Sequence, residues 1–178
     1  MFDIIIKNGT VIDGSGEPGR QEDVGIVADR IKMIGDLKKD KASTIIDATG
    51  QIVTPGFIDI QNHSDGYLTI LSYPHLESYL AQGVTTIIGG QCGSSLAPLL
   101  SREAIHSVRK WADVRGVNFN WITMTEYLDE IESRGLACNF GSLVGHTTVR
   151  RGLVGDQNRD LTAEELEVVT HVITQALD

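Results

Sequence analysis

The stretch Ile52–Asp65 reads IVTPGFIDIQNHSD and joins an apolar run to a polar end. The run is broken by Pro55-Gly56 and resumes as Phe57–Ile60. Apolar runs of this length between turn residues are typical of a buried parallel strand. Parallel α/β folds carry their chemistry at the carboxyl ends of the strands. His63 therefore lies where a ligand or catalytic group is expected, and Asp65 is placed to orient its second ring nitrogen.

A second strand is predicted at Val84–Ile88, and the sequence Gly89-Gly90-Gln91-Cys92-Gly93 follows it. Glycines let a backbone approach a ligand closely, and a cysteine thiolate binds zinc at about 2.3 Å. A thiolate is also a nucleophile in hydrolases that use a histidine, here His146, as the base. Free cysteines are most often small buried residues, which is the third interpretation. We predict that His63 and Cys92 face each other across a metal site, and the other two interpretations stay open.

A third, less regular strand is predicted at Leu136–Val144, and His146 follows it. Cys138 lies within this strand, so packing is its expected role. His146 is expected to hold substrate or to support a metal ligand. Three strand ends thus deliver His63, Cys92 and His146 to one rim of a parallel sheet.

The pattern of the chain changes near Gln51. Before it, short alternating apolar segments predict strands, and Asn8-Gly9 favours a hairpin. After it, strands alternate with helical patterns, as in a parallel α/β unit. We therefore predict two domains, residues 1–51 and residues 52–178. The expected helices are Pro74–Gly83, Ser101–Ala112, and two that open at the capping boxes Thr123-x-x-Glu126 and Thr162-x-x-Glu165.

Composition narrows the class of protein. The chain has 178 residues, a formal net charge of −9 and 41% hydrophobic residues. An acidic balance disfavours nucleic acid and anionic membranes as partners, because both need a basic surface. Two cysteines far apart do not make a disulfide framework, which indicates a reducing compartment. The opening MFDIIIKNG is too short and too polar for a secretory signal, so the expected location is cytoplasmic.

Several stretches, taken in chain order, resemble the amidohydrolase superfamily. Thr54–Asp65 is similar to its first barrel strand, where Pro-Gly-Phe-Ile-Asp is followed by His-x-His. Asp3–Gly14 resembles the opening strands of its small β-sandwich. Within the superfamily the resemblance is greatest to the N-acyl-D-amino-acid deacylases, or D-aminoacylases. The stretches that carry it are Gln82–Thr86, Gln91–Pro98 and Leu143–Arg150, of which the Cys-Gly element is the most specific.

The resemblance implies an α/β fold: the first three β/α units of a TIM-like barrel, preceded by part of a β-sandwich. It implies metal-dependent hydrolysis of the amide bond of N-acyl-D-amino acids, with Zn²⁺ as the cofactor. Cys92 matches the family's metal-ligating cysteine, and His63 matches the second histidine of His-x-His. Gln61 stands where the first histidine is usual, which weakens the metal position fed by that pair. The general-base Asp and the remaining histidines are expected beyond Asp178.

Two alternatives share this barrel entrance. One is a hydrolase of cyclic amides or imides, similar to a hydantoinase or dihydroorotase. The other is a catalytically incomplete metal-binding subunit, which the glutamine motivates. The expected partners are a small N-acyl amino acid and the remainder of the barrel, and a homo-oligomer is left open. The residues expected to bind substrate or support the metal ligands are His146, Asp65 and Gln61.

Overall fold

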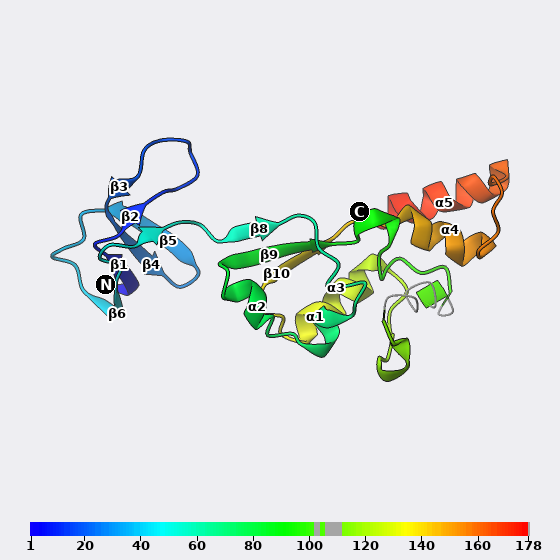
Figure 1. The fold of residues 1–178 in the computed structure, drawn as a ribbon, viewed down its shortest axis with the longest axis horizontal. Helices are drawn as coiled ribbons and strands as arrows, with labels where there is room; N and C mark the ends of the chain where they lie inside the picture. The colour runs from blue at the N-terminus through cyan, green and yellow to red at the C-terminus, as the bar shows by residue number, and fades with distance from the viewer. Residues whose placement is uncertain (102–103, 106–111, 178) are drawn as a thin grey trace. The chain divides into compact units, whose positions relative to one another are not determined.

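The computed structural model describes residues 1–101, 104–105 and 112–177, which form two compact units (Figure 1). The units are Met1–Pro55 and Gly56–Asp178. The division lies a few residues after the boundary expected at Ile52, because Ile52 and Val53 pair with a strand of the first unit. Among the described residues, no helix is long and apolar enough to cross a membrane.

The first unit contains two small sheets. Their strands are β1 (Phe2–Lys7), β2 (Thr10–Val11), β3 (Arg20–Gln21), β4 (Asp23–Val27), β5 (Arg30–Gly35), β6 (Ala42–Asp47) and β7 (Ile52–Val53). The larger sheet has the order β5-β4-β1-β6, with β1 antiparallel to β4 and parallel to β6. The smaller sheet has the order β3-β2-β7, with β2 parallel to β7. The all-β character expected of this region is therefore observed.

The hairpin expected at Asn8-Gly9 is wrong, because β1 and β2 belong to different sheets. Asn8 adopts a left-handed φ of 62°, and its backbone N–H donates to Asp23 Oδ1 at 2.9 Å. Its side-chain amide donates to Asp47 Oδ1, also at 2.9 Å. A Cβ at Gly9 would collide with the side chain of Val53. The dipeptide thus carries the chain from one sheet to the other, where close packing against β7 leaves room only for glycine.

The second unit is built on three parallel strands, β8 (Phe57–Asp59), β9 (Val84–Gly89) and β10 (Asn139–Ser142), in the order β10-β9-β8. The prediction of three parallel strands is confirmed. The prediction that the first of them is buried is wrong for the described residues, since Phe57 and Ile58 are 58% and 63% exposed. The reason is that β8 lies at the edge of this sheet and has one neighbour, β9.

Helices cover the second unit. They are α1 (Thr69–Ser72), α2 (Glu77–Leu80), α3 (Met124–Ser133), α4 (His146–Val154) and α5 (Ala163–Gln175), with short 3-10 helices η1 (Gln91–Gly93) and η3 (Val114–Gly116). In Figure 1, α4 and α5 run side by side, and these two helices are in contact. Both capping boxes are confirmed, because Thr123 and Thr162 each accept from the N–H of the glutamate three residues on.

One expected helix is wrong, one observed helix was not predicted, and one expected helix cannot be compared. The single helix Pro74–Gly83 is wrong, because Leu76 takes a left-handed φ of 41° and only the turn after it, α2, is helical. The helix α4 was not expected at all. The helix expected at Ser101–Ala112 lies largely outside the described residues.

An aromatic core lies between the sheet and α3. The rings of Trp121 and Tyr127 have centroids 5.2 Å apart, and Tyr127 meets Phe140 of β10 edge-on at 5.9 Å. Trp121 is fully buried and donates from Nε1 to the backbone oxygen of Leu96 at 2.8 Å. This hydrogen bond fixes the segment that follows the Cys92 loop, so the core anchors one side of the candidate site.

Candidate functional site

His63 and Cys92 lie together beyond the ends of the neighbouring strands β8 and β9. The distance between Cys92 Sγ and His63 Nε2 is 3.7 Å. A tetrahedral zinc ion bound at about 2.3 Å to sulfur and about 2.05 Å to nitrogen separates those atoms by roughly 3.6 Å. The two side chains therefore have the spacing of a pair that shares one metal ion, and their thiolate and imidazole donors suit zinc.

The Cys92 loop is a run of unusual backbone. Gly90, Cys92 and Gly93 have φ angles of 74°, 56° and 73°, all in the left-handed region. Such a conformation costs a residue with a side chain on the order of 1–3 kcal/mol, and it persists only where the surroundings enforce it. At Gly90 the surroundings are tight as well, because a Cβ there would meet the backbone of Leu143. The loop is thus held in a shape that lifts the Cys92 thiol toward His63.

Asp65 connects the turn that carries His63 to the start of this loop. Its buried carboxylate accepts from the backbone N–H of Gly90 at 2.7 Å and from that of Gly66 at 2.8 Å. Burial raises the pKa of Asp65, while these N–H donors and the nearby charge of His63 oppose the rise. In the described residues the carboxylate therefore binds backbone amides, and it shows no hydrogen bond to the imidazole it was expected to orient.

A second connection ties the far side of the loop to α4. The hydroxyl of Thr148 accepts from the backbone N–H of Ser95 at 3.0 Å and donates to the backbone oxygen of Ser95 at 2.9 Å. The Ser95 hydroxyl in turn accepts from the backbone N–H of Gly145 at 2.9 Å. Both hydroxyl residues are 2% exposed. The polar groups of Ser95 and Thr148 thus fix the Cys92 loop against the start of α4.

Side-chain amides bind the two strand ends to each other. Gln91 donates to the backbone oxygen of Ile60 at 2.7 Å, which crosses from the loop after β9 to the chain after β8. Asn62 is buried and donates to the backbone oxygen of Ile88 at 3.3 Å. The sequence interpretation selected neither Gln91 nor Asn62 as a site residue. The only available signal was that each is an amide residue placed just after a predicted strand.

The other expected site residues lie at the margin of this arrangement. Gln61 is exposed, and its side chain makes no hydrogen bond to His63 or Cys92 in the described part of the chain. His146 is the first residue of α4 and is exposed. Its Nδ1 lies 3.3 Å from the point where a Cβ on Gly93 would stand. Within the described residues, the thiol of Cys92 contacts His63 and not His146, so the geometry does not favour a Cys92–His146 nucleophile and base.

A cavity of about 270 Å³ opens at the His63–Cys92 pair. Tyr67, Thr147 and Arg151 are among the side chains that line it. The described residues contain no group of three or more histidines, cysteines or acids placed to hold a metal ion. The pair therefore supplies two ligands of such a site, next to a cavity with room for a small molecule.

Residues 44–172 match the Amidohydrolase family, and the chain belongs to that family. It is 37% identical over 176 residues to a D-aminoacylase of Alcaligenes xylosoxydans xylosoxydans. This match covers 99% of the chain and 36% of the relative. An N-acyl-D-glutamate deacylase from the same organism is 35% identical, again over 99% of the chain and 35% of the relative.

Solved structures agree in fold. A crystal structure of D-aminoacylase superposes with a TM-score of 0.84 at 35% identity, over 99% of this chain and 36% of that one. An N-acyl-D-glutamate deacylase from Bordetella bronchiseptica, complexed with zinc and a phosphonate inhibitor, gives 0.85 at 32% identity, with the same shares. The chain thus spans about a third of the length of the relatives it matches. Together these matches confirm the amidohydrolase resemblance seen in the sequence.

Proposed function

We propose that this chain is part of a metal-dependent hydrolase that cleaves the amide bond of N-acyl-D-amino acids. The observation that carries the proposal is the 3.7 Å separation of Cys92 Sγ and His63 Nε2 at the ends of adjacent parallel strands. The D-aminoacylase and N-acyl-D-glutamate deacylase similarities, which run along nearly the whole chain, support the substrate class. The zinc in the B. bronchiseptica relative supports Zn²⁺ as the metal.

In this proposal His63 and Cys92 hold the ion, and further ligands and the general base come from chain outside residues 1–178. A bound zinc ion supplies a Lewis acid for the amide carbonyl and a water of lowered pKa. The chain's own residues hold the two metal ligands in position. Asp65 fixes the backbone between the two ligands through Gly66 and Gly90, and Thr148 fixes the loop beyond Cys92 through Ser95.

The proposal includes one activating metal rather than two. Gln61 offers an amide where an imidazole would be the better zinc ligand, so a second position fed by that residue would be weak. A D-aminoacylase has been described as having a binuclear metal centre with one-metal activation and second-metal attenuation. A weakened second position is compatible with activity of that kind.

Zinc analysis and an assay of the whole protein test this function. We expect release of free amino acid from N-acetyl-D-amino acids, little from the L-enantiomers, and none from hydantoin or dihydropyrimidine. Chelation should abolish hydrolysis and zinc should restore it. Hydrolysis of the cyclic substrates instead would move the protein to the alternative activity, and an active chelator-treated enzyme would overturn the metal proposal.

Matched variants test the ligands. Cys92→Ala and His63→Ala should each weaken zinc binding by more than the roughly 100-fold that loss of an outer hydrogen-bond partner costs. Cys138→Ala is the control for the cysteine, because Cys138 is buried beside β9 with its thiol on the backbone oxygen of Val84. His75→Ala is the control for the histidine, as His75 is exposed. Unchanged zinc content in the first two variants would refute the assignment.

A further inference from the structure

Arg151 stands on the wall of the cavity that holds the His63–Cys92 pair. It lies in the last turn of α4, four residues after Thr147, which lines the same cavity. Residues four apart on a helix share one face. The α4 helix therefore presents both side chains to the space in front of Cys92.

The guanidinium of Arg151 has N–H donors that make no hydrogen bond within the described residues. Among the described residues it has one carboxylate partner, Asp156, at 3.1 Å from Nε, and it donates no hydrogen bond. The side chain of Asp156 is 88% exposed, whereas that of Arg151 is 28% exposed. An exposed ion pair of this kind is weak and is screened by salt. Arg151 can therefore exchange Asp156 for another anion at little cost in free energy.

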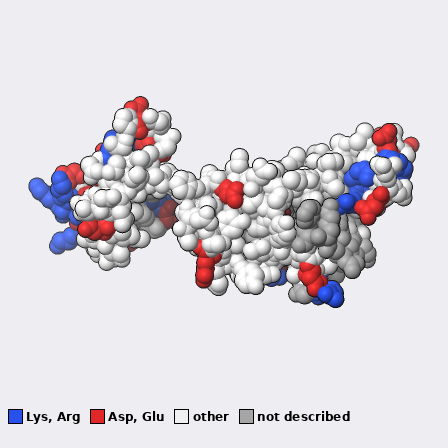
Figure 2. Space-filling view, viewed as in Figure 1, with Lys and Arg blue, Asp and Glu red and all other residues white. Residues whose placement is uncertain are grey.

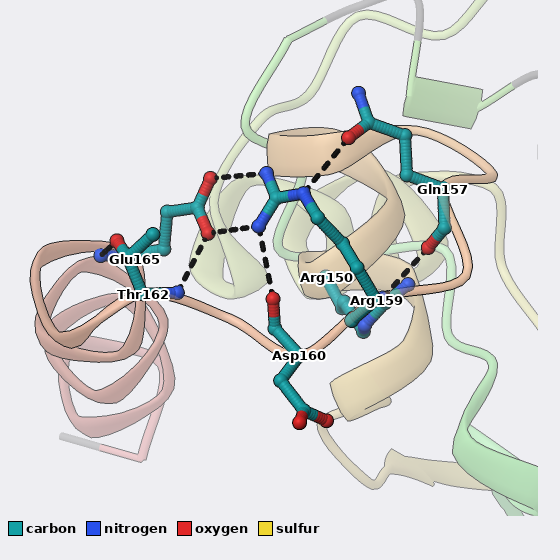
Figure 3. Close-up of polar contacts among 6 residues, drawn as sticks. All are labelled: Arg150, Gln157, Arg159, Asp160, Thr162 and Glu165. Atoms are coloured by element: carbon teal, nitrogen blue, oxygen red, sulfur yellow. Dashed lines mark hydrogen bonds and ion pairs between the residues drawn. The ribbon is translucent and has the colours of Figure 1, made fainter.

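Two other arginines near the end of α4, Arg150 and Arg159, each donate several hydrogen bonds to the protein. Arg150 donates to the backbone oxygens of Gln157 and Arg159, and Arg159 makes two hydrogen bonds of 2.7 Å to the carboxylate of Glu165 (Figure 3). These contacts hold the connection between α4 and α5. Arg151 takes no part in that network and faces the cavity instead.

The charges of the residues that line the cavity also favour binding of an anion at Arg151. With histidine taken as neutral, Arg151 is the one formally charged residue among the described residues that line it. Figure 2 shows acidic and basic side chains gathered at the α4–α5 end of the chain. A guanidinium whose described neighbours in the cavity wall carry no formal charge is suited to bind a carboxylate through paired N–H donors.

We propose that Arg151 forms an anion subsite that binds a carboxylate of the substrate while the amide bond lies at the His63–Cys92 pair. This rests on the proposed function and adds a residue that selects N-acyl amino acids over neutral amides. The carboxylate displaces Asp156 from the guanidinium. This carboxylate is either the α-carboxylate of the substrate or a carboxylate in its side chain. The two cases differ in which substrates are hydrolysed more slowly when Arg151 is replaced.

Alkylation of Cys92 tests the subsite without any hydrolysis. Iodoacetate carries a negative charge and iodoacetamide does not, yet the same thiolate attacks both, so the ratio of their rates isolates the effect of nearby charge. In chelator-treated protein we expect Arg151→Met to lower the iodoacetate-to-iodoacetamide ratio about 3- to 10-fold, with Arg151→Lys in between. Arg134→Met, which removes a paired arginine at the C-cap of α3, should leave the ratio unchanged.

The wild-type protein provides a further readout. Its ratio should exceed that of the uncharged reference thiol N-acetylcysteine amide and fall toward it in 1 M salt, because screening shortens the reach of the charge. Buried Cys138 should stay unlabelled, which reports that each variant remains folded. A wild-type ratio equal to that of the small thiol and insensitive to salt would overturn the subsite, whatever the variants do.

Kinetics of the whole enzyme then identify the carboxylate. If Arg151 binds the α-carboxylate, Arg151→Met lowers kcat/KM about 10- to 100-fold for N-acetyl-D-glutamate and N-acetyl-D-glutamine alike. If it binds a side-chain carboxylate, only the glutamate substrate is affected. Equal kcat/KM in wild type and variant for both substrates refutes the subsite and leaves the proposed function standing. A wild-type enzyme that hydrolyses neither refutes the proposed function, and the alkylation ratio still decides the subsite.

Discussion

Replacing Thr148 with valine keeps the shape of the side chain and removes one hydroxyl from the joint between α4 and the Cys92 loop. That hydroxyl bonds both the N–H and the carbonyl of Ser95, at 3.0 and 2.9 Å, in a place where both residues are 2% exposed. The substitution therefore leaves two buried backbone groups without partners. Each such group costs about 1–3 kcal/mol.

The costs of the two groups add to about 2–6 kcal/mol. We expect the free energy of unfolding to fall by about 2–4 kcal/mol, in the lower part of that range, because the loop can relax. With a urea dependence of about 2 kcal/mol per molar, the unfolding midpoint should move down by about 1–2 M. Fluorescence of Trp121, which is buried in the same unit, reports the transition.

Thr147→Val is the matched control. Thr147 is the preceding residue on α4, is half-buried, and makes no side-chain hydrogen bond to another described residue. Its variant should unfold within about 0.5 kcal/mol of wild type, as substitutions away from such features usually do. If Thr148→Val also stays within that range, the two hydrogen bonds do not hold the loop and the reasoning fails.

The remaining predictions concern one ion pair and one backbone position. The hydrogen bond from Arg159 lowers the pKa of Glu165 from 4.5 to about 2, so the ionised glutamate stabilises the fold above its ordinary pKa and that contribution disappears as the pH falls toward 2. Glu165→Gln should accordingly lower the Tm at pH 6 and leave it unchanged at pH 2, and a Tm difference that is constant across this range would contradict the assignment. Gly90→Ala should destabilise the protein by more than about 2 kcal/mol, since it adds a clash with the backbone of Leu143 to the strain of a φ of 74°. Gly135→Ala, with a φ of 69° and open space around it, isolates the strain alone and should cost only about 1 kcal/mol; equal unfolding midpoints for the two variants would show that the clash is absent.

The sequence was informative where the signal is local. The two capping boxes place a hydroxyl and a carboxylate three residues apart, and both open helices as expected. Apolar β-branched runs predicted the parallel strands, and the position of His63 and Cys92 after two of them predicted that they meet. These inferences need only periodicity and the rule that strand ends share an edge.

The helix α4 could not be predicted in this way. Its N-cap is Gly145, which has no side chain to cap with, and Thr147, Thr148 and Val149 are β-branched residues of low helix propensity. Burial of Thr148 and Val149 against the rest of the unit stabilises it instead. Without that helix, Arg151 could not be distinguished from Arg150 as the residue that faces the cavity.

The hydrogen bonds that shape the site were also invisible in the sequence. Ser95 and Thr148 are 53 residues apart, and a hydroxyl carries no mark of the partner it will find. Asp65 was expected beside the imidazole of His63, but two backbone amides hold it first. Buried polar groups are satisfied by whichever donors the fold brings near, and this depends on tertiary packing.

The joint between Ser95 and Thr148 has a consequence for the order in which the chain folds. Closing a loop of 53 residues has an entropic cost that must be met before the contact returns any energy. The Ser95–Thr148 hydrogen bonds that support the Cys92 loop can therefore form only once α4 is in place. During synthesis, when the chain emerges from its amino end, the loop lacks this support until residues some fifty positions later have left the ribosome.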